Sequence, residues 1–417
     1  DYCEEFWDRI YAEPLDKTSY LDDIDDALLQ YKKGAEKEVN YLVKEFECRK
    51  SADAYARAST SRTGVLDTEK LHTYKFNEDV FKRISVLPDG KNHGLLFLLD
   101  WSGSMHSCMG ATVKQLLNLV WFCKKVNIPF RVYGFTNCYF TEEVTKYYRK
   151  SEDSLIKEPR RNEIWIDQSY RLLEFLSSEG NIKQFERQVR TFWRLASAMS
   201  RQNEWYLDIP QRFHLSGTPL DTSLIVLHEI IPQFKKKYDL QKVQTIILTD
   251  GESMSLSYGA GTQYEGEEEK VRPRSLDYGN VQLRDRKTGR VYKKMDGYQN
   301  TTTTLIQQVR DRNAGVSVTG FRILPPNRLS EFVARFADYS KYEEVQKQWR
   351  KQKSAILPFP KGYSALYAIS TKDLEEDVEF EVKEGAKKGE ITRAFKKMLK
   401  SKSTNKKLLT SFVEYVA

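Results

Sequence analysis

Five oxygen-bearing side chains, in three short segments, have the types and the spacing of a site for a divalent cation. An apolar run over 94–99 ends in Asp-Trp-Ser-Gly-Ser at 100–104, and a second, largely apolar run over 243–248 ends in Thr-Asp-Gly. Between them, the segment 216–222 (SGTPLDT) supplies a threonine. Hard divalent cations prefer oxygen ligands such as these. The candidate ligands are Asp100, Ser102, Ser104, Thr218 and Asp250.

The chemistry of these ligands favours binding over catalysis. Three of the oxygens fall on one tight loop, where Gly103 permits the sharp turn. If the three neutral hydroxyls coordinate the ion directly and the two aspartates act mostly through water or hydrogen bonds, the ion keeps much of its positive charge. Such an ion attracts a carboxylate from outside the domain. The alternative is structural, with the aspartates capping helices and the hydroxyls satisfying loop backbone, but the order of the three segments favours a metal site.

The elements that must position these ligands alternate between strand and helix. Continuous apolar runs such as 95–100 are typical of central parallel strands, because helices cover both of their faces. The pattern from residue 94 predicts an α/β fold, a doubly wound and mostly parallel Rossmann-like sheet with right-handed crossovers. Such sheets place ligand sites at the carboxyl ends of their strands, where the five side chains fall. We expect strands at 95–100, 130–136, 243–250 and 316–323, and helices at 113–126, 169–205, 220–238 and 301–313.

The pattern divides the chain into three regions. Residues 1–90 are expected to form a helical N-terminal region, because apolar residues recur there at spacings of three and four. Residues 91–325 are expected to form the main domain, with insertions near 151–215 and 253–300. A β-hairpin is predicted around 287–289 in the second insertion. Residues 326–417 are expected to form a charged, helical C-terminal region, with a helix at 329–353, an acidic stretch at 373–384 and basic helices at 391–400 and 406–416.

The motifs DWSGSM, GTPLDT and ILTDGES resemble the metal-ion-dependent adhesion site (MIDAS) of von Willebrand factor A domains, in the order and at the strand positions that this family uses. The resemblance covers about residues 92–325. It implies that the family's five metal-site positions are taken by Asp100, Ser102, Ser104, Thr218 and Asp250, and that the ion is Mg²⁺ or Mn²⁺. It also implies protein binding, in which an Asp or Glu of a partner completes the coordination.

A narrower resemblance concerns residues 64–71 (GVLDTEKL) and 81–83 (FKR), which precede the first site strand. They are similar to the segment before the A domain in CobT, a cobaltochelatase subunit whose relatives also occur in bacteriophages. The resemblance implies a non-catalytic, chelatase-like or protein-remodelling adaptor. Its partner would be an AAA+ ATPase of the CobS or MoxR type, whose force it transmits to a third protein. The alternative is a structural assembly protein of a virion or scaffold, with the metal site in an intersubunit contact.

Catalysis by this chain itself is not expected. A triad can be written with Ser104, His214 and Asp250, but its serine would have to leave the metal site. The hydrolase elbow GxSxG is absent, since Trp101 stands where its glycine belongs. A nucleotide-binding GxxxxGK[ST] loop is also absent. The Gly-rich segment 258–269 is acidic, and it is either a flexible surface loop or a partner-binding loop.

The amino-acid composition narrows the class of protein and its expected location further. Of the 417 residues, 40 % are hydrophobic and 30 % are charged, and no run approaches the roughly 18 apolar residues needed to span a bilayer. The start, DYCEEFWDRI, shows no secretory signal, so the cytoplasm, or a host's cytoplasm for a phage protein, is the expected location. Five cysteines without a CxxC pair indicate buried free thiols rather than zinc or disulfides.

Nucleic-acid binding is a separate hypothesis. The net charge of +8 comes from 67 basic and 59 acidic residues, a mild excess with no nucleic-acid-binding motif beside it. Aromatic and basic residues do alternate over 187–194 and 292–294, where they could follow a phosphate backbone. The helical spacing of the aromatics is explained more simply by a core stripe, so nucleic acid is not the expected partner.

Overall fold

The computed structural model describes most of the chain between residues 15 and 370. The described residues are 15–57, 59–66, 81–86, 92–139, 159–200, 209, 211–262, 270–278, 281–292, 298–336, 339–352, 354–357 and 360–370.

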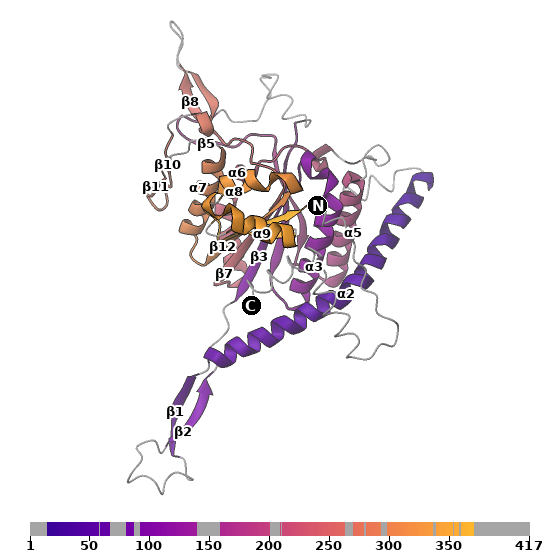
Figure 1. The fold of residues 1–417 in the computed structure, drawn as a ribbon, viewed down its shortest axis with the longest axis vertical. Helices are drawn as coiled ribbons and strands as arrows, with labels where there is room; N and C mark the ends of the chain where they lie inside the picture. Colours follow the sequence, from indigo (N-terminus) through magenta and orange to yellow (C-terminus); the bar gives the residue numbers. More distant parts are fainter. Residues whose placement is uncertain are drawn as a thin grey trace.

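A seven-stranded sheet runs through the centre of the molecule (Figure 1). Its strand order is β13-β14-β12-β7-β3-β4-β6. The four inner pairings are parallel, and the pairing at each edge is antiparallel. The predicted α/β class with a mostly parallel, doubly wound sheet is therefore confirmed. The strands are β3 (His93–Asp100), β4 (Phe130–Asn137), β6 (Tyr170–Ser177), β7 (Lys242–Thr249), β12 (Val316–Leu324), β13 (Ser354–Ile356) and β14 (Ala365–Ser370).

Helices cover both faces of this sheet, which explains why its central strands are continuously apolar. In β3, Leu95, Phe97 and Leu99 face one hydrophobic core, whereas Leu96 and Leu98 face the other. The first core lies under α2 (Leu15–Arg57), α3 (Met109–Lys125) and α5 (Ile182–Ser200). The second lies under α6 (Leu220–Tyr238), α7 (Tyr298–Arg312), α8 (Leu329–Phe336) and α9 (Tyr342–Gln352).

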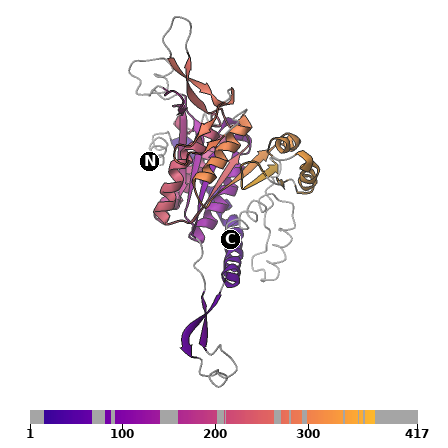
Figure 2. The same cartoon turned by 90° about the vertical axis from the view of Figure 1, so that its left-hand side faces the viewer.

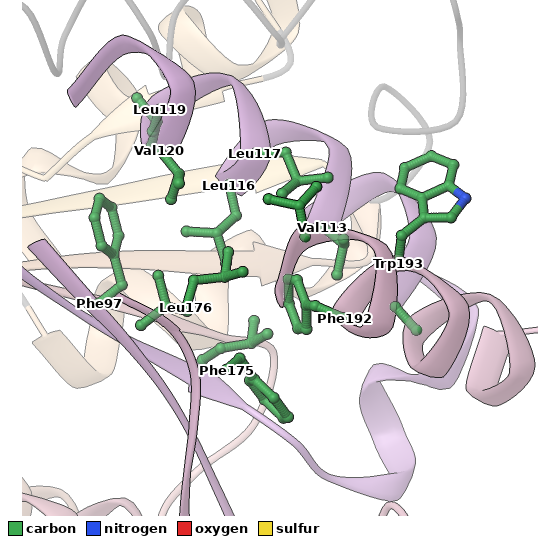
Figure 3. Close-up of a cluster of buried hydrophobic side chains, with 14 of the residues drawn as sticks. Phe97, Val113, Leu116, Leu117, Leu119, Val120, Phe175, Leu176, Phe192 and Trp193 are labelled. Carbon is green, nitrogen blue, oxygen red and sulfur yellow. The ribbon is translucent and has the colours of Figure 1, made fainter. Parts of the chain in front are cut away.

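The segment 169–205 does not form the single long helix that the sequence predicts. Residues 170–177 form the antiparallel edge strand β6, and the helix α5 begins only at Ile182. Phe175 lies over Gly134 of β4, where an added Cβ would come within 2.2 Å of the ring. Figure 3 shows Phe175 and Leu176 beside Phe192 of α5. This part of the predicted insertion therefore belongs to the sheet and its core.

The N-terminal region is helical only in part. The helix α2 packs against α3 and α5 through seven buried apolar side chains, and its far end leads into a two-stranded ribbon that projects from the body (Figure 1). The ribbon consists of β1 (Ser59–Leu66) and β2 (Phe81–Val86), which pair antiparallel. Residues 59–66 and 81–86 are thus a correction to the expected helical region. The buried residues of α2 are Leu21, Ile24, Leu28, Ala35, Val39, Leu42 and Phe46.

The sheet also continues past residue 325, where a separate C-terminal region was expected. β14 pairs in parallel with β12, and α8 and α9 pack on the second core. The predicted helix at 329–353 is interrupted by a short 3-10 turn at Tyr339–Lys341. The acidic stretch at 373–384 and the predicted helices at 391–400 and 406–416 lie outside the described residues.

The second predicted insertion projects beyond the carboxyl edge of the sheet (Figure 2). It contains β8 (Ser257–Thr262) and β9 (Lys270–Ser275), which form a three-stranded sheet with β5 (Ile164–Trp165). The predicted hairpin around 287–289 is confirmed by the pair β10 (Leu283–Arg284) and β11 (Val291–Tyr292). Gly289 has a φ of 72°, which a side chain would oppose.

The thiols and the helices of the described residues give two further findings. Cys48, Cys108, Cys123 and Cys138 are all free thiols, as the sequence predicts. The last three are buried, whereas Cys48 is exposed, so the prediction of a buried thiol is wrong for Cys48. Within the described ranges, every helix is too short or too polar to cross a membrane.

Candidate functional site

The five candidate ligands lie together at the point where the order of the sheet reverses. From β3 the chain adds β4 and β6 on one side, and β7, β12 and β14 on the other. Crevices at such switch points bind ligands in open α/β sheets. Asp100 is the last residue of β3 and Asp250 directly follows β7, and these two strands are neighbours. The topology therefore brings the two carboxylates to one place.

Hydrogen bonds and close contacts connect the five side chains. The Ser102 and Ser104 hydroxyls are 3.0 Å apart, and Ser104 donates to Asp250 Oδ1 at 2.8 Å. A Cβ added to Gly251 would lie 3.7 Å from Thr218 Oγ1 and 3.8 Å from Ser104 Oγ. The Ser102 hydroxyl also lies close enough to Asp100 to lower its pKa, so all five predicted residues occupy one site.

Hydrogen bonds to backbone carbonyls fix the loops that carry the hydroxyls. The Trp101 indole is fully buried and donates from Nε1 to the carbonyl of Phe213 at 2.7 Å. The Gly103 N–H donates to the carbonyl of Ser216 at 2.9 Å. The Met254 N–H donates to the carbonyl of Thr218 at 2.8 Å. The three loops are therefore held against one another before any ligand binds.

The site has a buried floor and an open mouth. Asp100 and Ser102 are buried, Thr218 and Asp250 are half-buried, and Ser104 is exposed. Burial raises the pKa of Asp100 to about 7, against the opposing effect of the nearby hydroxyls of Thr249 and Ser102, and the negative charge of Asp250 raises it further. Burial also raises the pKa of Asp250. A positive charge at the mouth would stabilise the ionised form of both carboxylates.

One atom of the floor is left without a partner. Thr249 donates to Asp100 Oδ2 at 2.5 Å, whereas Asp100 Oδ1 is buried and makes no hydrogen bond. An unpaired buried carboxylate oxygen is costly unless a cation or a donor meets it. No three His, Cys, Asp or Glu side chains gather into a metal site anywhere in the described residues, and the candidate site itself combines only two carboxylates with hydroxyls. The donor set of two carboxylates and three hydroxyls fits a hard divalent cation.

Arg322 is a charged neighbour of the site that the sequence reasoning did not single out. It lies on β12 in register with Thr249, and its side chain is 5 % exposed. Its guanidinium is 3.4 Å from Glu252 and 5.2 Å from the centre of the Phe336 ring. Its positive charge lowers the pKa of both site aspartates. A single arginine within the apolar run VSVTGFRIL was the signal that could have revealed it.

Glu252 extends this charged group to α8. Arg335 of α8 donates to Glu252 Oε1 at 2.9 Å and also pairs with Glu331. Glu252 follows Asp250 by two residues, so the loop after β7 carries one carboxylate to the mouth and another to the two arginines. Only the position of Glu252 in TDGE hinted at this role.

Asp221, in the same GTPLDT segment as Thr218, has a structural role instead. It is 1 % exposed, and Thr302 of α7 donates to its Oδ1 at 2.6 Å. The Asp221 N–H donates to Ser253 Oγ at 2.8 Å. Burial raises the pKa of Asp221 to about 8. This side chain joins the start of α6 to α7.

The residues of the alternative hypotheses are engaged elsewhere. His214 Nε2 is 3.0 Å from the carbonyl of Ile209, and Ser104 is bonded to Asp250, so the triad is not assembled. Phe192 and Trp193 are buried in the first core, and Arg194 pairs with Asp25 of α2. The aromatics of 187–194 therefore form a core stripe, as their helical spacing indicates.

The solved structures named here resemble this chain at low sequence identity. No family model matches the sequence, and no curated protein matches it. The pilus adhesin SpaC from Lactobacillus rhamnosus GG is similar in two crystal structures, each with a TM-score of 0.32 and 14 % identity. The matches cover 57 % and 78 % of this chain, and 25 % and 31 % of the adhesin, so the chain spans less than a third of that protein.

A third match is the vWF domain of the type V pili tip protein Mfa5 from Porphyromonas gingivalis. Its TM-score is 0.27 at 6 % identity, over 56 % of this chain and 82 % of that domain. TM-scores of this size support no inference about the site or its ligands.

Proposed function

We propose that this chain is a metal-dependent protein-binding module in which Mg²⁺ or Mn²⁺ at the candidate site receives a carboxylate from a partner. The fully buried, unpaired Asp100 Oδ1 is the observation that carries the proposal. It lies beneath hydroxyls that a cation can use, at the switch point of the sheet. The motif resemblance to the MIDAS of von Willebrand factor A domains supports the same assignment.

The residues present would divide the work between the floor and the mouth. Ser102, Ser104 and Thr218 would supply hydroxyl oxygens to the cation, and Asp100 and Asp250 would hold it through hydrogen bonds or water. The bound cation would act as a Lewis acid toward a carboxylate. Because Ser104, Thr218 and Asp250 face the open mouth, a side chain from outside the domain can approach there. The hydroxyl-rich donor set leaves positive charge for it.

The finer proposal concerns the partner. On the resemblance to CobT, the partner is an AAA+ ATPase of the CobS or MoxR type that supplies an Asp or Glu, and a third protein is remodelled. This is a role for an adaptor in the cytoplasm rather than for an enzyme. Co-purification of such an ATPase with the chain in Mg²⁺, and its loss in EDTA, would support the role. Equal recovery in EDTA would contradict it.

Calorimetric titration with Mg²⁺ and with Mn²⁺ tests the metal site itself. Wild-type protein should bind one ion, and Asp100→Ala should abolish the binding signal. Asp277→Ala is a matched control, because this half-buried aspartate, in the 3-10 turn Leu276–Tyr278, is bonded to Thr301 at 2.9 Å and lies outside the site. Binding that survives Asp100→Ala and is lost in Asp277→Ala would place the metal elsewhere.

A further inference from the structure

The described strands and turns of the two insertions carry exposed cations beside the candidate metal site, whereas residues 263–269, between β8 and β9, contain four glutamates in the sequence. We define the cationic arm as residues 159–165, 257–262, 270–278 and 281–292, which contain β5, β8, β9, β10 and β11. Among these described residues, every exposed charged side chain is a cation. They are Arg160, Arg161, Lys270, Arg272, Arg274, Arg284, Arg286, Lys287 and Arg290.

The acidic side chains of the arm are used internally. Glu163 accepts a hydrogen bond from Arg286 at 3.1 Å, which joins the β10–β11 turn to the β5 segment. Asp277 accepts a hydrogen bond from Thr301. Asp285 is buried and accepts from the N–H of Lys287 at 2.8 Å. The outward charge of the described arm is therefore positive, although the arm contains three acids.

Short contacts place the base of the arm at the mouth of the site. Met254, whose N–H donates to the carbonyl of Thr218, is 43 % exposed at this rim. The next residue, Ser255, has its hydroxyl 2.5 Å from that of Ser275 at the end of β9. Arg274 precedes Ser275. The exposed cations of the arm thus begin within a few residues of the loop that contacts Thr218.

Two arginines of β9 are well placed for a ligand in extended conformation. Arg272 pairs across the sheet with Ala260 and Arg274 with Tyr258, so both side chains lie on one face, about 7 Å apart along the strand. Neither forms an ion pair with any residue that the structure describes. Pro273 between them lacks an N–H, which opposes addition of a further strand at this edge. A ligand would therefore be held by the side chains.

We propose that the cationic arm binds an acidic segment of the same partner protein whose carboxylate reaches the metal site. The metal contact in this proposal rests on the proposed function, whereas the arm contact rests on the arm's own charges. Both surfaces select carboxylates, and they are contiguous, so one acid-rich segment satisfies them together. A nucleic acid would meet the cations but bring no carboxylate. Of the arm's aromatics whose exposure the structure describes, Trp165 and Tyr258 are half-buried and Tyr292 is buried, so none of these three offers an exposed face for base stacking.

Fluorescence anisotropy with defined probes tests the arm. The probes are a labelled 12-residue peptide of alternating Glu and Ser, the same peptide with Gln in place of Glu, and a labelled 12-nucleotide single strand of DNA. Arg272→Gln/Arg274→Gln should weaken binding of the Glu peptide about ten-fold, since one exposed ion pair contributes up to about five-fold. Lys236→Gln/Lys242→Gln removes the same charge from exposed lysines at the opposite end of the sheet, and should change binding less than two-fold.

The outcomes separate the arm from the metal site. Equal weakening by both double variants would mean a net-charge effect and would overturn the arm proposal, as would tighter binding of the DNA than of the Glu peptide. Arm-dependent binding of the Glu peptide that is the same in Mg²⁺ and EDTA supports the arm and counts against the proposed metal contact. Mg²⁺-dependent binding that is unchanged in Arg272→Gln/Arg274→Gln supports the metal contact and overturns the arm proposal.

Discussion

Replacing Asp100 by asparagine should change the stability of the protein in opposite directions with and without a divalent cation. Burial raises the pKa of Asp100 from 3.8 to about 7, and each unit corresponds to 1.36 kcal/mol. The ionised side chain therefore destabilises the metal-free fold by up to about 4 kcal/mol at pH 8. The asparagine amide needs an acceptor of its own, which offsets part of the gain. We expect Asp100→Asn to raise the free energy of unfolding in EDTA by about 1–3 kcal/mol at pH 8.

The sign of this effect follows from linkage. Between pH 3.8 and about 7 the folded protein keeps a proton on Asp100 that the unfolded chain has lost, so wild-type stability falls as the pH rises through this window. The gain in Asp100→Asn should be absent near pH 4 and complete above pH 7. In Mg²⁺ the order reverses, because a ligand at a thousand times its Kd stabilises the wild type by about 4.1 kcal/mol, which exceeds the gain of the variant, and the variant cannot use it.

Urea unfolding at pH 5 and pH 8, in EDTA and in Mg²⁺, gives the free energy of unfolding under all four conditions. Asp221→Asn is the matched control, because burial raises its pKa to about 8 but it bonds to Thr302 rather than facing the site. This variant should gain stability at high pH and keep the Mg²⁺ effect. Equal stabilisation of Asp100→Asn and wild type by Mg²⁺ would remove Asp100 from the metal site. A loss of stability in EDTA at pH 8 would refute the burial argument.

Three further substitutions test the surroundings. Arg322→Met should bind Mg²⁺ roughly ten-fold more tightly in calorimetry at pH 8, because a fixed cation beside the site is removed. The control Arg335→Met should change the affinity less than two-fold. Equal affinities in the two variants would mean that the charge of Arg322 does not weaken metal binding. Trp193→Ala should lower the free energy of unfolding by about 3–5 kcal/mol, since this buried ring also donates to α2, whereas a loss under 1 kcal/mol would mean that α2 docks without it. Gly134→Ala should cost about 1–3 kcal/mol, because its Cβ would meet the ring of Phe175 at 2.2 Å, and Phe175→Leu should restore part of that loss unless the clash argument is wrong.

The sequence predicted those elements whose burial follows from a local pattern of apolar residues. β3 and β7 are covered on both faces and appear as continuous apolar runs, so their ends were predicted to within two residues. The helix α6 matches its predicted range of 220–238. Because these elements end beside Asp100, Thr218 and Asp250, the gathering of the candidate ligands followed from strand ends and parallel topology.

β6 shows why other parts could not be predicted. Its sequence, YRLLEFLS, has apolar residues at spacings of one, two and three, which also fit a helix. What selects the strand is the free edge of β4 and the space above Gly134, which Phe175 fills. Both are contacts across about 40 residues. The same holds for β14, whose apolar run is determined to be a strand by its parallel pairing with β12.

The charges around the site explain why a divalent cation suits it. Asp100, Asp250, Glu252 and Glu331 stand against two cations, Arg322 and Arg335. When all four carboxylates are ionised, this group carries two net negative charges, and protonation of Asp100, which the raised pKa allows, removes one of them. A divalent cation would displace that proton and balance both charges. A monovalent cation would leave one charge unbalanced, so the arginines and the carboxylates together favour a divalent ion.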